Sequence, residues 1–418
     1  FLTSLLAIAA AWCWFGIIRR IFGAQIAFCS ALLFFFCPPV IYYTSRGLFP
    51  NVPFVSLLII GTFFLLLRPI ALSLEKWRWV NDAAGMAAFG GAFLIRPNEF
   101  VWVGLAGLGI ISVYFRVISK YRLALWAALG LGMVAFFYWY NRALYDHPLG
   151  TYISSESFPV RHWYSVFFPF GFDPTLILHT GYWYGLRLMW WLAPAYLGLA
   201  LFFARLRPTP DIPREQKVYA ATTVGVGLWL LLYYGSAYDP AMYTHMIGVS
   251  YVRYWLPVFI LLTPYLPMFF LWLKERLAGR VWLGTALLYG IVIIALGGNL
   301  AFRGRDGLSP QIRNLREARE VREWVLANTP PSAIVVSDTE DKFIWPAREV
   351  MVKFFHPAIG RAMREFLDAG RPVYYLGPSL SEADGERASA HVRHFGAALR
   401  EGKTFGAHTL YALERAVE

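Results

Sequence analysis

Three arginines and one glutamate have the chemistry needed to hold and react with a phosphate-linked substrate. Arg46, Arg96 and Arg253 each lie at the edge of a long apolar run, and Glu99 follows Arg96 by one helical turn. A guanidinium group offers two parallel donors to phosphate oxygens, and a carboxylate can take a proton from a hydroxyl group. The competing interpretations are that Arg46 only reaches lipid headgroups, and that Arg96 and Glu99 only pair with each other to fix a helix break.

Other aromatic and polar side chains near these residues are candidate substrate-binding groups. Aromatic rings and short polar side chains suit the faces and hydroxyl edges of a sugar. The aromatic members could instead belong to the ordinary tryptophan and tyrosine belt of a membrane protein. The candidates for substrate binding are Tyr43, Asn51, Asn98, Asp146, His147, Tyr152 and His245, and Tyr254 joins the arginines as a candidate for the phosphate.

We expect no metal and no cofactor. The histidines do not cluster at the spacing of metal ligands, and Cys13, Cys29 and Cys37 all lie in apolar runs. No glycine-rich phosphate loop follows a predicted strand, and no nucleophile elbow is recognisable.

The elements that must position these residues are membrane-spanning helices. The 418 residues are 58% hydrophobic and only 15% charged, whereas soluble domains have roughly 45–50% apolar and about 25% charged residues. Too few charges remain to coat a water-soluble enzyme. The chain is therefore expected to be an α-helical polytopic membrane protein.

Apolar runs long enough to cross a bilayer occur about ten times. Pro97 separates the fourth run from the fifth, so Arg96, Asn98 and Glu99 are expected in a recess beside a broken helix. The runs are 1–18, 24–43, 53–70, 80–95, 98–115, 123–140, 186–204, 218–235, 254–273 and 281–298.

The positive charge is unevenly distributed between the connections of these spans. Nearly all of the net charge of +12 lies before residue 299. If the spans alternate, one set of connections carries about 15 basic residues and the opposite set about 6, and an excess of this kind marks the cytoplasmic side. The candidate site is therefore expected on the extracytoplasmic side of the cytoplasmic membrane. Basic residues between apolar spans also argue against nucleic-acid binding.

This map divides the chain into two predicted domains. Residues 1–298 form a transmembrane helical domain with exterior loops at 141–185 and 236–253, and residues 299–418 form a small extracytoplasmic domain. The first span would enter from outside, although Phe1 has no basic flank of the kind a signal peptide carries. We therefore expect at least one upstream span and an exterior loop before it.

The second domain is predicted to have an α/β fold. Apolar residues at helical spacing precede Pro330, and a further helix is expected at 357–369. Strands are expected at 333–336 and 372–376, with a closing strand at 408–413.

Several short motifs occur in an order that resembles the GT-C superfamily of multi-span glycosyltransferases, which includes protein O-mannosyltransferases and the aminoarabinose transferase of lipid A. The resemblance implies transfer of a sugar from a polyprenyl-phosphate donor to a lipid, glycan or protein acceptor on the extracytoplasmic face, with membrane lipids as further partners. The motifs are Leu2–Gly23 with its ending Arg19–Gly23, Pro38–Asn51, Phe93–Pro97, Tyr140–Tyr152 and Arg253–Pro257.

The chain departs from the superfamily pattern at two points. Members carry a catalytic Asp or Glu in their first exterior loop, which would precede Phe1, so Glu99 is the stand-in for a catalytic base. Some relatives have an acidic residue where Asn51 stands here. The alternatives are a lipid or glycan transporter or flippase, and a non-catalytic protein of GT-C type. The sequence shows no repeat of the kind common in transporters.

Overall fold

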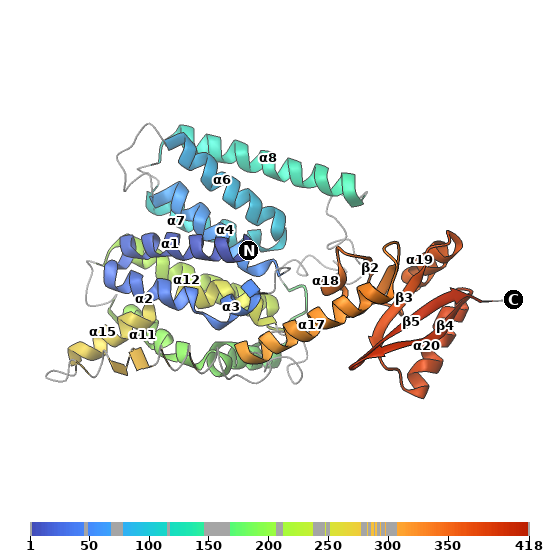
Figure 1. Cartoon of the computed structure of the whole chain (residues 1–418). Coiled ribbons are helices and arrows are strands. Elements are labelled where there is room, and N and C mark those ends of the chain that lie inside the picture. Colours follow the sequence, from blue (N-terminus) through green and yellow to red (C-terminus); the bar gives the residue numbers. More distant parts are fainter. Residues whose placement is uncertain are drawn as a thin grey trace. The chain divides into compact units, whose positions relative to one another are not determined.

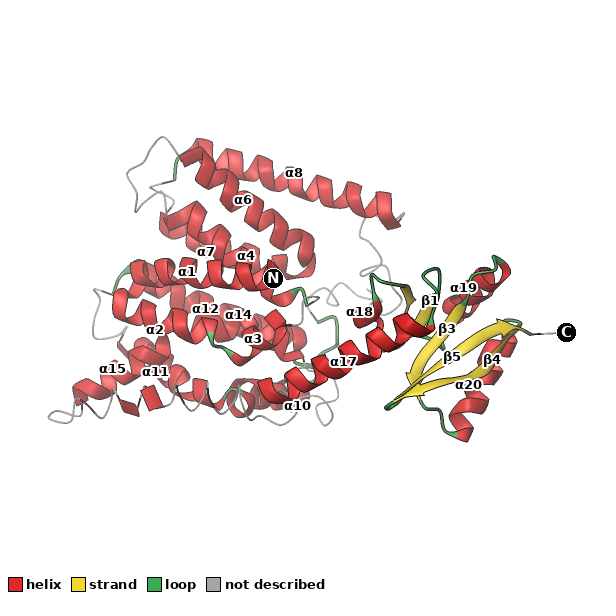
Figure 2. Cartoon of the chain, in the orientation of Figure 1, coloured by secondary structure: helices red, strands yellow, loops and turns green. Residues whose placement is uncertain are grey.

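The structure, a computed structural model, describes residues 2–45, 49–67, 78–114, 118–145, 168–205, 212–236, 251–276 and 307–416, with isolated positions between 247 and 297. The chain forms two compact units, Phe1–Gly307 and Leu308–Glu418. Figure 1 labels their elements, and Figure 2 shows that the described part of the first is helical while the second combines helices with a sheet.

The helices of the first unit follow the apolar runs of the sequence, and several are interrupted by short turns of 3-10 or π geometry. These turns are Phe63–Leu67, Pro97–Glu99, Gly181–Leu188, Trp190–Leu192 and Tyr251–Trp255. The helices are α1 (Leu2–Phe22), α2 (Ala24–Phe35), α3 (Pro38–Ser45), α4 (Asn51–Thr62), α6 (Arg78–Ile95), α7 (Phe100–Tyr114), α8 (Lys120–Tyr145), α10 (Pro174–Thr180), α11 (Ala193–Arg205), α12 (Arg214–Tyr234), α14 (Leu256–Leu262) and α15 (Tyr265–Arg276).

Few of these helices could cross a bilayer unbroken. Among the described residues, α1 and the segment Lys120–Leu144 of α8 are long and apolar enough to do so, and counting each of four bent pairs as one span raises the number to six. The predicted total of ten spans therefore stays a prediction. The last predicted span, 281–298, lies almost wholly outside the described residues.

Close helix packing builds the interior of the first unit. α1 lies against α2 and α4, α4 against α6, and α7 against α12. α11 and α15 also pack together, and Gly198 makes this approach possible, because a β-carbon at this position would lie 2.1 Å from the carbonyl oxygen of Tyr265. Small residues at such crossings are typical of membrane helices, where packing takes the place of the hydrophobic effect.

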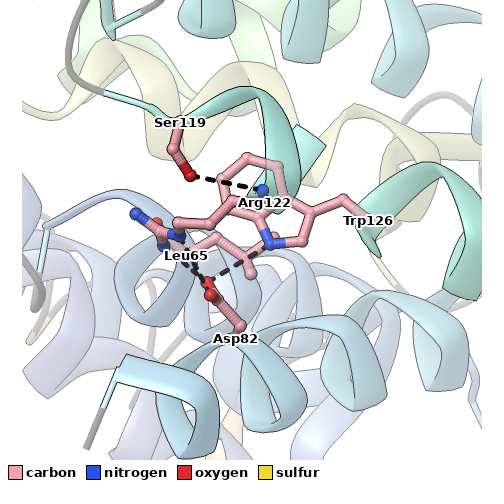
Figure 3. A network of polar contacts seen from close by, with 5 residues as sticks. All are labelled: Leu65, Asp82, Ser119, Arg122 and Trp126. Carbon is pink, nitrogen blue, oxygen red and sulfur yellow. Dashed lines mark hydrogen bonds and ion pairs between the residues drawn. The ribbon is translucent and has the colours of Figure 1, made fainter. Parts of the chain in front are cut away.

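A buried ion pair ties α8 to α6 (Figure 3). Arg122 donates to both carboxylate oxygens of Asp82, and its guanidinium also donates to the carbonyl of Leu65 at 3.2 Å. The indole N–H of Trp126 donates to Asp82 at 3.2 Å. Asp82 is only 3% exposed. Burial of these charges is tolerated because each is paired and hydrogen-bonded.

The second unit is built on a five-stranded sheet with the order β2-β1-β3-β5-β4. β1 pairs in parallel with β2 and β3, whereas β5 is antiparallel to β3 and β4. The elements are α17 (Leu308–Asn328), β1 (Ile334–Ser337), α18 (Asp341–Ile344), β2 (Glu349–Met351), α19 (Pro357–Asp368), β3 (Val373–Pro378), α20 (Glu382–His394), β4 (Ala397–Phe405) and β5 (His408–Arg415).

This mixed sheet with helices confirms the α/β fold predicted for the C-terminal region. The expected strands correspond to β1, β3 and β5, and the expected helices to α17 and α19. β2, β4 and α20 were not predicted. β2 is a short edge strand without a fully buried residue, β4 is interrupted by a register shift between Arg400 and Lys403, and α20 buries only Ala388 and Val392.

A small polar cluster lies where β1 ends and β5 begins. Glu340 accepts a hydrogen bond from the hydroxyl of Ser337 at 2.6 Å, and Nε2 of His408 lies 3.3 Å from its other oxygen. Burial by itself raises the pKa of Glu340, but hydrogen bonds from Ser337 and Thr339 and the nearby His408 outweigh it, so the pKa is lowered.

Candidate functional site

A sharp break between α6 and α7 creates the candidate site. The chain turns by 109° at Arg96 and Pro97, and Pro97–Glu99 forms a single 3-10 turn. A proline disfavours helical geometry in the residue before it, and Arg96 accordingly adopts a φ of −146° and a ψ of 76°. The turn places Glu99 inside the unit, where it is 4% exposed.

Three donors hold the carboxylate of Glu99. Its Oε1 lies 2.7 Å from Nη2 of Arg96 and accepts a hydrogen bond from the hydroxyl of Tyr234 at 2.6 Å. Its Oε2 accepts from the indole N–H of Trp102 at 2.5 Å. These donors come from the turn, from α7 and from α12, so the carboxylate joins elements that are far apart in the sequence.

Two tyrosine rings carry this network on to a second arginine. The rings of Tyr234 and Tyr254 are stacked with centroids 4.5 Å apart, and the guanidinium of Arg96 lies 4.4 Å from the centroid of Tyr254. The guanidinium of Arg253 lies 5.0 Å from the same ring, and its Nη2 donates to the hydroxyl of Tyr254 at 3.2 Å. A cation over an aromatic face is attracted by the ring quadrupole. Tyr254 therefore contacts both arginines.

The two arginines differ in how their charge is balanced. Glu99 compensates Arg96 directly. Arg253 makes no ion pair with any carboxylate of the described residues; its contacts there are with the rings of Phe49 and Tyr254 and with the Tyr254 hydroxyl. Arg253 is half-buried. It is therefore the cation of this network best able to accept an anion.

An apolar cavity adjoins the network. Its volume is about 180 Å³, and its walls come mainly from α1, α4, α7, α12 and α14. Representative wall residues are Trp14, Ile59, Trp102, Val226 and Ile260. Trp102 thus lines the cavity with its ring while its N–H binds Glu99. A polar centre beside an apolar cavity suits a ligand with a charged head and a hydrocarbon chain.

The remaining described candidates have different surroundings. Tyr43 is buried, donates to the carbonyl of Ile247 and packs edge-on against Phe49, which also contacts Arg253. Asn51 is 2% exposed, and its amide nitrogen has no hydrogen-bond partner among the described residues. A buried amide donor without a partner, as at Asn51, is rare enough to indicate a position where a ligand or water binds. Asn98 lies half-buried in the turn with Glu99.

Five candidates lie outside the described residues and stay predictions. They are Arg46, Asp146, His147, Tyr152 and His245.

Sequence reasoning missed two members of the network, Tyr234 and Trp102. Both are aromatic residues within apolar runs, where nothing distinguishes a ligand-binding ring from a lipid-facing one. The only local signal was the spacing of Trp102, which lies one helical turn after Glu99.

The described residues contain no group of three or more His, Cys, Asp or Glu side chains that could hold a metal ion.

Comparisons with known proteins identify the fold. No protein-family model and no curated protein sequence matches the chain. Two crystal structures of ArnT from Cupriavidus metallidurans do match, each over 98% of this chain and 82% of the ArnT chain. The apo structure aligns with a TM-score of 0.53 and 11% identity, and the structure bound to undecaprenyl phosphate aligns with a TM-score of 0.58 and 12% identity.

The chain therefore has a mostly helical membrane fold like that of ArnT, with a C-terminal mixed-sheet domain. The resemblance to the GT-C superfamily is confirmed at the level of fold. Fold alone does not establish an activity, which has to be argued from the site.

Proposed function

We propose that this chain is a membrane glycosyltransferase that moves a sugar from a polyprenyl-phosphate donor to a lipid, glycan or protein acceptor. One observation carries the proposal. An arginine without a carboxylate partner among the described residues, Arg253, belongs to a network that reaches an apolar cavity through Trp102. A polyprenyl-phosphate sugar has the matching parts, an anionic phosphate and a hydrocarbon chain.

The arginine-bearing side of the network would bind the phosphate. Arg253 can donate two parallel hydrogen bonds to phosphate oxygens, and the hydroxyl of Tyr254 lies beside it. In the reaction, an acceptor hydroxyl attacks the anomeric carbon and the bond from that carbon to the phosphate oxygen breaks. The electron pair stays on the phosphate, and the hydroxyl proton passes to a base. Preorganised cations stabilise the charge that develops on the phosphate, which is usually the largest contribution to such a step.

The cavity would hold the isoprenoid units nearest the phosphate. Most of its wall residues are apolar, although Glu215 and Thr222 of α12 also line it, so burial of a hydrocarbon chain against the apolar walls is favourable. The bound undecaprenyl phosphate of one ArnT structure supports this choice of lipid. We further propose that the site opens on the extracytoplasmic side of the cytoplasmic membrane, as the distribution of basic residues predicts.

The test is a transfer assay with the purified protein in liposomes. The protein is incubated with labelled undecaprenyl-phosphate sugars and a panel of acceptor lipids, and the release of undecaprenyl phosphate is measured. Acceptor-dependent release that is lost in Arg253→Ala and kept in Arg319→Ala, a change at an exposed position of α17, supports the proposal. Absence of release with every sugar refutes it, and movement of intact donor between leaflets favours a flippase instead.

A further inference from the structure

Glu99 is the one acidic residue among the described members of the network, and it lies beside a cation that could otherwise bind the phosphate. Its partner Arg96 lies over the ring of Tyr254, whose hydroxyl accepts from Arg253. The two arginines therefore contact the same tyrosine. The charge of Arg96 would attract any anion bound at the proposed phosphate site.

We propose that Glu99 tunes this site to the charge of the sugar donor and against the charge of the lipid product, so that the product is released. The inference rests on the proposed glycosyl transfer. It makes Glu99 a specificity-determining residue of that reaction in place of its base.

The geometry of Glu99 argues against a role as base. A base needs a free lone pair that faces the acceptor hydroxyl. Oε1 of Glu99 accepts from Arg96 and Tyr234, and Oε2 accepts from Trp102, so these three donors take up most of the roughly four acceptor positions of a carboxylate. The side chain is also almost completely buried. An acceptor hydroxyl would have to enter this buried position and share Oε2 with the indole N–H of Trp102.

The pairing of Glu99 also differs from that of a purely structural ion pair. Arg122 donates to both carboxylate oxygens of Asp82 and also to the carbonyl of Leu65. Arg96 instead lies 2.7 Å from Oε1 of Glu99, donates to the hydroxyl of Tyr234 at 3.1 Å, and has its guanidinium 4.4 Å from the centroid of the Tyr254 ring. Such an arrangement compensates the charge of Arg96 and keeps its guanidinium against Tyr254, the ring that Arg253 also contacts.

The charge balance distinguishes donor from product. The described charged groups of the network are Arg96, Arg253 and Glu99, so two positive charges and one negative charge leave a net charge of +1. The phosphodiester of a polyprenyl-phosphate sugar carries one negative charge. Transfer of the sugar leaves a phosphomonoester, which carries about −1.5 to −2 at neutral pH. A site of net charge +1 matches the donor, whereas a site of +2 would favour the product.

Loss of Glu99 should therefore trap the product. In Glu99→Gln the two arginines face the phosphate without compensation, and the doubly charged monoester gains more from the added charge than the diester does. Slow product release limits many enzymes. The first turnover would remain while later turnovers slow down.

The experiment compares binding of undecaprenyl phosphate with steady-state kinetics for the full-length protein in nanodiscs. We expect Glu99→Gln to bind undecaprenyl phosphate on the order of tenfold more tightly at pH 8. The gain should be smaller at pH 5.5, where the monoester carries less charge. The KM for the donor should change less than the product inhibition constant.

Two further variants control for the shape of the site. Arg96→Gln combined with Glu99→Gln restores the original net charge, so its affinity for undecaprenyl phosphate should return toward that of the wild type. Trp102→Phe removes one hydrogen bond to Glu99 and leaves every charge in place, so it should not tighten product binding. In Glu99→Gln the new amide NH2 could face the indole N–H of Trp102, and two opposed donors would destabilise the site. Glu99→Gln combined with Trp102→Phe removes the indole donor and so avoids this conflict.

The outcomes separate the possible roles of Glu99. A large fall in kcat with unchanged product affinity would identify a base and overturn the inference. Weaker binding of donor and product alike would show a structural role and overturn it as well. If the wild type binds undecaprenyl phosphate without transferring any sugar, the proposed transferase activity fails, and if it binds no undecaprenyl phosphate, the phosphate site itself is refuted.

Discussion

The two ends of α6 each carry a buried pair of carboxylate and arginine, and the pairs are built differently. Near the start of α6, Arg122 binds both oxygens of Asp82 and a backbone carbonyl, and the pair links segments far apart in the sequence (Figure 3). Just beyond its end, Arg96 lies 2.7 Å from Oε1 of Glu99 within a single turn and also donates to the hydroxyl of Tyr234. In both places a tryptophan N–H donates to the carboxylate.

The different contacts of the two carboxylate–arginine pairs indicate that the pairs have different roles. The pair at Asp82 is closed, because its described partners satisfy both charges and join α6 to α8. The pair at Glu99 continues through stacked tyrosines to Arg253, a cation without an acidic partner among the described residues. A closed pair is expected to stabilise the fold, whereas an open one is expected to bind a ligand. Substitutions at the two pairs and at their tryptophans test this distinction.

The largest effect is expected when the closed pair is broken. Asp82→Asn leaves Arg122 without a counter-charge, which should lower the free energy of unfolding by about 3–5 kcal/mol. Unfolding in mixed micelles measures this loss. Asp82→Leu combined with Arg122→Met should cost much less, because no unpaired charge remains. A stable Asp82→Asn variant would show that the pair is not a structural clamp.

The next largest effect is expected at the open end of the network. Arg253→Ala should reduce sugar transfer about a hundredfold, the scale on which loss of one preorganised electrostatic contact acts. Its thermal stability should stay close to that of the wild type, because no carboxylate of the described residues depends on it. Arg253→Lys should recover part of the activity, since lysine keeps the charge and loses the paired donors. Transfer rates and unfolding temperatures measured side by side check both statements.

The two tryptophans allow a matched comparison of smaller size. Trp126→Phe and Trp102→Phe each remove one indole hydrogen bond to a buried carboxylate, so each should cost about 1–3 kcal/mol of stability. Only Trp102→Phe should also weaken the binding of undecaprenyl phosphate, because Trp102 lines the cavity as well and the smaller ring loses apolar contact there. Equal effects of the two variants on lipid affinity would contradict the distinction between the pairs.

The smallest effect is expected at a carboxylate of the C-terminal unit. Glu340, with 19% of its side chain exposed, lies beside His408, and its pKa is lowered by the balance of burial, hydrogen bonds and His408. Because the folded state favours the ionised form, its contribution is present above the ordinary value of 4.5 and is lost as the pH falls through the lowered pKa.

Glu340→Gln should therefore lower stability by less than about 1 kcal/mol at pH 7. It should also flatten the loss of stability below pH 4.5. Thermal unfolding of the C-terminal unit followed between pH 3 and pH 7 measures both. A steeper acid dependence in the variant than in the wild type would contradict the assignment.

Features of the site that lie within one turn of the chain could be predicted from the sequence, whereas contacts between residues far apart in the sequence could not. A short apolar run followed by proline revealed the break at Arg96, and spacing along one turn revealed Glu99. Tyr254 was found because it adjoins Arg253. Tyr234 reaches the same place from α12 only through tertiary packing, and a tyrosine at the end of an apolar run has no sequence signal for that role. The pairing of Asp82 with Arg122 spans 40 residues and was missed for the same reason.

The helix boundaries show a similar limit. Hydropathy averages over a window, so it reports where a chain is apolar and not where it bends. The predicted run at 24–43 is divided between α2 and α3, which meet at an angle of 46°. In the C-terminal unit, β1 and β3 were predicted because their apolar and aromatic residues form short continuous runs bounded by turn residues. β4 was not, because its charged side chains and register shift hide the alternation of a strand.

The indole of Trp102 lines the apolar cavity with its ring and donates its N–H to the carboxylate of Glu99. A hydrocarbon tail bound in the cavity would contact the indole ring whose N–H binds Glu99. Binding of the tail and the position of the Glu99 carboxylate would therefore be coupled through Trp102. Analogues that lack the isoprenoid units nearest the phosphate would leave the indole of Trp102 without this contact. Truncated lipid analogues should therefore impair the chemistry at the headgroup even where their phosphates are identical.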